Sequence, residues 1–154
     1  MIGDKTSQSR LRGIALVETV IVTPVLLFLM LATAEITNAF VDHNTLTKSV
    51  RNGARFLAGK AILGTTGNIV LTSEKTLATR RLVVYGNASG SGSPILPGLS
   101  IGDVQVADLG NNDIEVTATY AYTGILGDTL PALGFGSDID LGMTLQASVS
   151  MKGL

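Results

Sequence analysis

Apolar residues are concentrated near the N-terminus, in a run of 21 residues from Ile14 to Ala34. Five positions interrupt this run, namely Glu18, Thr19, Thr23, Pro24 and Thr33. A helix of this length is about 30 Å long, which is enough to cross the hydrocarbon core of a bilayer. Threonine hydroxyls can bond to carbonyls of their own helix and so fit the run, whereas Pro24 predicts a kink. We therefore predict a transmembrane helix over residues 14–34.

A helical pattern continues after this run, but polar residues now occupy one side of it. The predicted apolar row consists of Ile36, Phe40, Val50, Ala54, Leu57 and Ala61, with His43 and Thr47 filling its gap. This pattern predicts an amphipathic continuation of the helix over residues 35–63, ended by the glycine-rich residues 64–67. Small residues within it favour close approach of a second helix, and they are Gly53, Ala54, Ala58, Gly59 and Ala61.

A second, shorter helix is predicted from Thr72 or Ser73 to about Tyr85, because either hydroxyl can cap its first turn. Its predicted apolar stripe consists of Ala78, Leu82 and Tyr85, widened by Leu77 and Val84.

The rest of the chain alternates with period two, which predicts strands over residues 103–109, 113–123 and 138–151. The turn residues 110–113 join the first two strands as an antiparallel hairpin. The predicted fold class is α+β: a long N-terminal transmembrane and amphipathic helix, a second shorter helix, and a small three-stranded antiparallel sheet. Residues 64–154 would form one α+β domain outside the membrane.

Composition and charge give no indication of catalysis or nucleic-acid binding. The net charge is −1 and no basic patch is evident, so we expect no nucleic-acid partner. The absence of cysteine excludes thiol chemistry and disulfides. His43 is the only histidine, and the polar residues near positions 103–113 have the spacing of turns and not of a calcium loop. We predict no catalytic, cofactor or metal site and no small-molecule substrate.

The residues on either side of position 14 indicate a topology. Before the apolar run the charged residues are Asp4, Lys5, Arg10 and Arg12, which favours a cytoplasmic N-terminus. A secretory signal peptide cleaved near residues 33–39 is the alternative, but the length of the run and its carboxylate, Glu18, count against it. A carboxylate inside a membrane helix costs about 2.5–3.5 kcal/mol at mid-span, so Glu18 requires a reason. Glu35 is interpreted as a residue at the membrane boundary.

The stretches "RGIALVETVIVTP" and "NGARFLAG" resemble the TadE-like pseudopilins of the Flp (Tad) pilus, a type IV pilus system. This resemblance implies a pilin-like fold and a basic leader over residues 1–13. It also implies cleavage between Gly13 and Ile14 by a prepilin peptidase. Glu18 would be the fifth residue of the mature chain and would set assembly register against a neighbouring subunit.

The resemblance further implies a single-pass protein of the bacterial inner membrane that later reaches the periplasm or the pilus. Its implied partners are the prepilin peptidase, the major Flp pilin, a second minor pilin and the inner-membrane assembly platform. An uncleaved single-pass membrane protein with an external ligand-binding or envelope-interaction domain remains the alternative.

Overall fold

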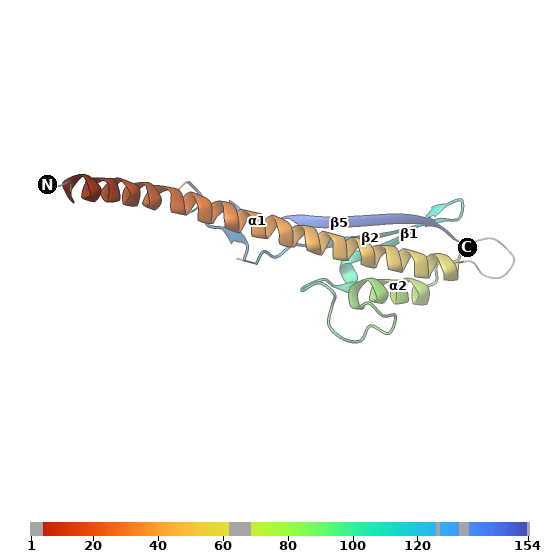
Figure 1. The fold of residues 1–154 in the computed structure, drawn as a ribbon. Helices are drawn as coiled ribbons and strands as arrows, with labels where there is room; N and C mark the ends of the chain where they lie inside the picture. The colour runs from red at the N-terminus through yellow and green to blue at the C-terminus, as the bar shows by residue number, and fades with distance from the viewer. Residues whose placement is uncertain (1–4, 62–68, 126, 133–135, 154) are drawn as a thin grey trace.

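The computed structural model describes residues 5–61, 69–125, 127–132 and 136–153, with side chains from Ala15 onward. One long helix, α1 (Lys5–Ala61, 57 residues), runs the length of the molecule (Figure 1). At 1.5 Å per residue it is about 85 Å long. The shorter helix α2 (Ser73–Tyr85) and the single turn η1 (Ile101–Asp103) follow. The predicted helix end at position 63 and the glycine-rich residues 64–67 lie outside the described residues.

A three-stranded antiparallel sheet lies along the C-terminal half of α1 (Figure 1). Its strands are β1 (Val104–Gly110), β2 (Asp113–Ala121) and β5 (Thr144–Lys152), with β2 in the centre. Asn111 and Asn112 join β1 to β2 with φ angles of 53° and 64°, the left-handed values that a tight hairpin turn requires. The predicted fold class is confirmed, as is the hairpin.

The predicted strand over residues 138–151 is confirmed from Thr144 onward but wrong before it, because the chain forms two strands there. β4 (Ile139–Asp140) pairs with β3 (Thr129–Leu130) in a separate two-stranded sheet, and β5 begins only at Thr144. The side chain of Asp140 accepts a hydrogen bond from the backbone N–H of Gly142 at 2.8 Å. This local turn takes the backbone out of the ladder between the two strands.

The main core lies between the sheet and one face of α1. On β2 the inward residues Ile114, Val116, Ala118 and Tyr120 are buried, as the alternation predicts. Val50, Ala54, Leu57 and Ala61 of the predicted helix row are also buried. Ile36 and Phe40 are 70% and 66% exposed, so that part of the predicted row is wrong. Counting back from Val50 by 11 and 15 residues, three and four helical turns, the covered face passes through Ala39 and Glu35.

Helix α2 packs closely on α1 at Gly53. A Cβ atom placed on Gly53 would lie 2.5 Å from Cγ2 of Val83, so a glycine is required at this contact. The buried residues of α2 are Thr79, Val83 and Val84, whereas Leu77 is exposed and the rest of the predicted stripe is half-buried. Of the predicted stripe, Val84 is buried and Tyr85 packs against the core, whereas the prediction is wrong for Leu77. Thr79 tolerates burial because its hydroxyl donates to the carbonyl of Lys75 at 2.8 Å.

Candidate assembly surface on the N-terminal helix

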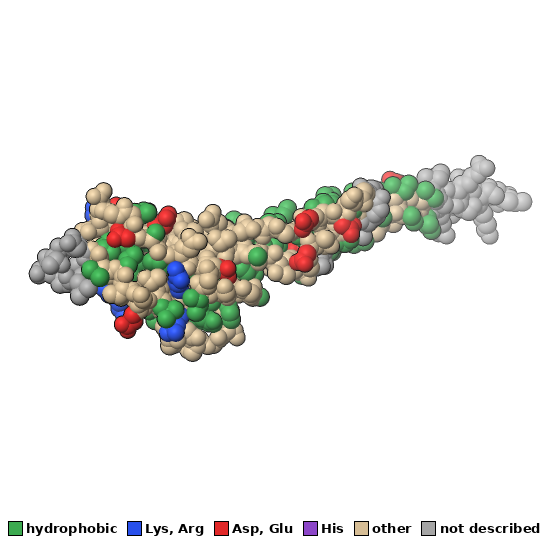
Figure 2. Space-filling model, turned by 180° about the vertical axis from the view of Figure 1, so that it is seen from behind, with side chains coloured by type: hydrophobic (Ala, Val, Ile, Leu, Met, Phe, Trp, Pro, Cys, Tyr) green, Lys and Arg blue, Asp and Glu red, His purple; other side chains and the backbone are tan. Residues whose placement is uncertain are grey.

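The N-terminal part of α1 extends beyond the rest of the molecule as a bare apolar helix (Figures 1 and 2). From Ala15 to Thr23 every side chain is exposed, including Leu16, Val17, Val20, Ile21 and Val22. Among the described residues, α1 is the one helix long and apolar enough to cross a membrane, with a mean hydropathy of 2.3 over its most apolar window. Thr19 and Thr33 donate to the carbonyls of Ala15 and Leu29 at 2.8 and 2.7 Å, as expected for threonines in apolar surroundings.

Glu18 lies on this bare surface with its side chain exposed. It is the only ionisable residue between Ala15 and Ala34. The Gly13–Ile14 bond also lies within α1, and the helix continues through Pro24 without interruption. Glu18 and the proposed cleavage point are therefore five residues apart on one continuous helix.

Glu35 occupies a site that the sequence interpretation missed. It is 3% exposed, and its interpretation as a residue at the membrane boundary did not include this burial. The hydroxyl of Tyr122 donates to Oε2 of Glu35 at 2.8 Å, and the backbone N–H of Ile125 donates to the same oxygen at 3.1 Å. Asn38 donates to the Tyr122 hydroxyl at 3.1 Å. These contacts fasten the segment after β2 to α1.

The surroundings of Tyr122 keep it a hydrogen-bond donor. Burial raises the pKa of Tyr122 above its usual value; the hydrogen bond from Asn38 lowers this pKa, and Glu35 raises it. Gly124 fits beside the pair because it lacks a side chain: a Cβ atom there would lie 3.0 Å from Oε2 of Glu35. The signal in the sequence is that Glu35, Ala39 and Leu46 lie on one helical face, which places a carboxylate in the buried row.

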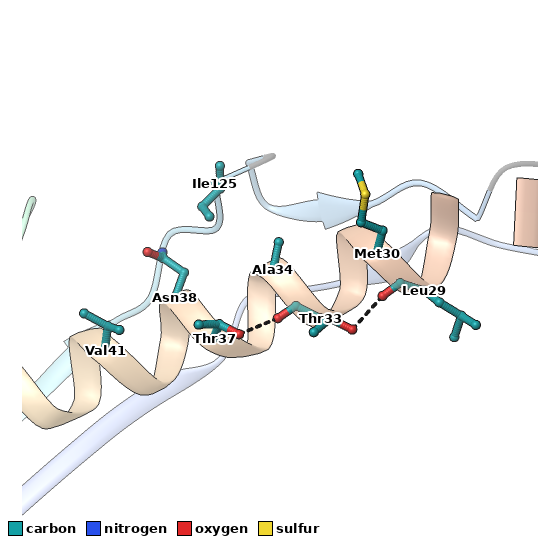
Figure 3. A pocket seen from close by; sticks show the side chains of 8 residues that line it. All are labelled: Leu29, Met30, Thr33, Ala34, Thr37, Asn38, Val41 and Ile125. Carbon is teal, nitrogen blue, oxygen red and sulfur yellow. Dashed lines mark hydrogen bonds between the residues drawn. The ribbon is translucent and has the colours of Figure 1, made fainter. Parts of the chain in front are cut away.

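The chain between β2 and β5 forms an arm, defined here as residues 122–125, 127–132 and 136–143, which carry β3 and β4. Leu130, Ala132 and Leu141 of the arm are buried although they do not belong to the main core. The arm lies beside α1 next to the bare helix (Figures 1 and 3). The side chains of α1 that are half-buried there form a single face, on the same side as Glu35: Pro24, Phe28, Leu31 and Ala32.

The outer side of the arm is acidic. Asp128, Asp138 and Asp140 are exposed, and acidic side chains gather where the globular part meets the bare helix (Figure 2). Oδ1 of Asp138 accepts the backbone N–H of Ala132 at 3.0 Å, so this carboxylate also supports the arm's own backbone. The arm therefore has buried apolar residues on its inner side, and its exposed residues include these carboxylates together with Ile125, Ile139 and Met143.

An open groove runs along α1 beside Ile125 (Figure 3). Its volume is about 670 Å³, and it is lined by Leu29, Met30, Thr33, Ala34, Thr37, Asn38, Val41 and Ile125. From Val20 to Val41 the exposed side chains of α1 are apolar or threonine, and Lys48, Arg51 and Arg55 follow on the exposed surface. The apolar surface of α1 thus extends about two turns beyond the predicted span.

The remaining sequence candidates have local roles. His43 Nε2 lies 3.3 Å from the carbonyl oxygen of Gln146 on β5, a packing contact of the kind expected. Asp103 accepts the backbone N–H and hydroxyl of Ser100 at 2.8 and 2.7 Å, and Asp108 accepts the N–H of Gly110 at 2.8 Å. These carboxylates act in turns, as their spacing predicts.

Comparison with known families identifies the helix that carries these features. Residues 13–55 match the family described as TadE-like protein. This segment is TadE-like. The TadE-like segment begins at Gly13 and ends within α1, so it contains the bare helix, Glu18 and Glu35. The resemblance predicted from the sequence is confirmed for this segment. Searches of curated proteins and of solved structures gave no match.

Proposed function

We propose that this chain is a minor pilin or pseudopilin of a Flp-type (Tad) pilus, processed after Gly13 and incorporated or primed through its N-terminal helix. It would enter the inner membrane with its N-terminus in the cytoplasm and its sheet outside. Its partners would be the prepilin peptidase, the assembly platform, the major Flp pilin and a second minor pilin. Its role would be structural and not catalytic.

The observation that carries this proposal is the bare apolar helix with Glu18 on it, within the TadE-like segment. Cleavage after Gly13 would create a positive amine on Ile14, and Glu18 of the same or a neighbouring chain could pair with it. Such a pair in apolar surroundings is close to neutral in net stability once desolvation is included. Misregister would leave two unpaired charges in an apolar bundle, and this penalty gives Glu18 a role in register.

Cleavage requires local opening of α1, since the Gly13–Ile14 bond is helical in the free chain. A glycine inside a helix lowers helix stability by about 0.5–1 kcal/mol relative to alanine, so Gly13 is a favourable place for such opening. The peptidase would act on this short segment before assembly.

The test is the intact mass and the N-terminal peptide mass of the protein from native membranes and from sheared filaments. We expect a chain that begins at Ile14, and we expect it in the sheared material. A chain that begins at Met1 and occurs only in membranes would contradict the proposal and favour an uncleaved membrane protein with an external binding domain.

Two variants make the test specific to Glu18. Glu18→Ala should insert into the membrane normally but be lost from sheared filaments. Glu74→Ala is the matched control, because it also removes one exposed carboxylate but from the first turn of α2. Equal amounts of both variants in filaments would rule out the register role of Glu18.

A further inference from the structure

The arm lies beside a part of α1 that belongs to the predicted membrane span. The half-buried face formed by Pro24, Phe28, Leu31 and Ala32 lies inside the span predicted over residues 14–34. Among the residues of α1 whose side chains are described, the stretch exposed on all sides is 15–23, and nine helical residues are about 14 Å long. This is less than half of the hydrocarbon core, which is about 30 Å thick. The helix therefore cannot cross a bilayer unless the face under the arm also enters it.

The arm itself is unsuited to the bilayer interior. Its exposed residues include Asp128, Asp138 and Asp140, and carboxylates are strongly disfavoured in hydrocarbon. Its two-stranded sheet of β3 and β4 has open edges, and irregular backbone or an open sheet edge is not found in contact with lipid chains. An arm that stayed closed during insertion would carry all of these groups into the membrane.

The covered face of α1, in contrast, is suited to lipid. Proline, phenylalanine, leucine and alanine present only apolar atoms there, and lipid tails are as apolar as a leucine side chain. The arm begins at the level of Glu35, where Tyr122 and Ile125 bind the carboxylate. This attachment lies one residue beyond the predicted span and can remain in place while the rest of the arm moves away.

We propose that the face formed by Pro24, Phe28, Leu31 and Ala32 is a lipid-binding surface, occupied by acyl chains in the membrane and by the arm outside it. This inference rests on the proposed function, because it takes α1 as the membrane span. The closed arm described here then belongs to the protein outside the bilayer. On leaving the membrane the face loses its lipid, and the arm replaces it.

The chain contains no tryptophan, so a single introduced indole can report contact with lipid. Phe28→Trp places the indole under the arm, and the control Leu26→Trp places it at a position that is 59% exposed. The full chain is reconstituted in phosphatidylcholine vesicles with or without bromine on the acyl chains. We expect bromine to cause an equal loss of emission from both variants.

Quenching of Leu26→Trp with full emission from Phe28→Trp would overturn the proposal, since the arm would still shield the face. The proposed function would survive that result if the processed chain is found in filaments. Quenching of neither variant would show that α1 is not inserted, and it would overturn the membrane stage of the proposed function together with this surface.

A second measurement tests whether the arm is accessible from water when the protein is in the membrane. The chain contains no cysteine, so Asp140→Cys on the arm and Ser150→Cys on β5 each provide a single thiol at an exposed position. We expect a membrane-impermeant maleimide to label both at the same rate in sealed vesicles, among the molecules whose sheet faces outward. Protection of Asp140→Cys alone would overturn the proposal, because it would place the closed arm in the bilayer.

Discussion

At the scale of single residues, the buried carboxylate of Glu35 has the clearest consequence for stability. It accepts hydrogen bonds from the Tyr122 hydroxyl and from the Ile125 backbone, both close to α1. A buried donor that loses its acceptor costs about 1–3 kcal/mol. Glu35 therefore stabilises the attachment of the arm, a role that its interpretation as a membrane-boundary residue did not include.

We predict that Glu35→Ala lowers the free energy of unfolding by about 2–4 kcal/mol, because two donors lose their acceptor. Glu35→Gln should lose less, since the amide keeps one acceptor oxygen. The measurement is denaturant unfolding of the full chain in detergent. Ile36→Ala is the control, because this side chain is 70% exposed, and a change within about 0.5 kcal/mol is expected. Equal losses in Glu35→Ala and Ile36→Ala would contradict a role for the carboxylate.

At the scale of elements, the packing of α1 against α2 depends on one glycine. Gly53 lies against Val83, whose branched side chain has little freedom to move. The hydroxyl of Ser49 also donates to the Val83 carbonyl at 2.6 Å, which fixes the helices at this distance. Gly59, the other glycine expected at a close contact, is exposed, and a Cβ atom there would meet nothing within 4 Å.

We predict that Gly53→Ala lowers the free energy of unfolding by about 1–2 kcal/mol, because overpacking outweighs the gain in helix propensity. Gly59→Ala should raise it by about 0.5–1 kcal/mol, because only the propensity changes. Thermal unfolding of the two variants in the same detergent makes the comparison. If Gly53→Ala were as stabilising as Gly59→Ala, the close approach of α1 and α2 would be wrong.

The elements themselves could be predicted from the sequence because each has a strong local signal. The apolar run, the cap at Thr72 and the alternation in β2 all depend on neighbouring residues. The arm could not be predicted, because β3 and β4 pair across about ten residues of chain. Its hydrogen bond between Tyr122 and Glu35 joins positions 87 residues apart. For the same reason Glu18, which stands out locally, was found as a candidate, whereas the role of Glu35 depends on its distant partners Tyr122 and Ile125.

At the scale of the whole molecule, the helix belongs to two environments. The first residue of α1 that belongs to the main core is Ala39. The side chains from Ala15 to Thr23 are all exposed. The globular part should therefore not depend on the bare helix for its fold.

We predict that a chain lacking residues 1–32 keeps its sheet and needs no detergent, because the longest exposed apolar stretch is gone. A chain lacking residues 1–38 also loses Glu35 and Asn38, and its Tm should be lower by about 10 °C. Size-exclusion chromatography and thermal unfolding of both chains provide the comparison. Equal Tm values would show that the contacts of Tyr122 contribute nothing to the fold.

Because α1 is continuous, the orientation of the sheet around the helix axis also fixes the directions of the side chains on the bare helix. Each residue turns the helix by about 100°, so the 17 residues between Glu18 and Glu35 leave their side chains about 100° apart around the axis. Since the arm and the sheet hold Glu35 on a fixed side, the azimuth at which Glu18 points is determined by the globular part. Rotation of the external domain about the helix axis therefore changes the direction in which the carboxylate of Glu18, roughly 25 Å away, points.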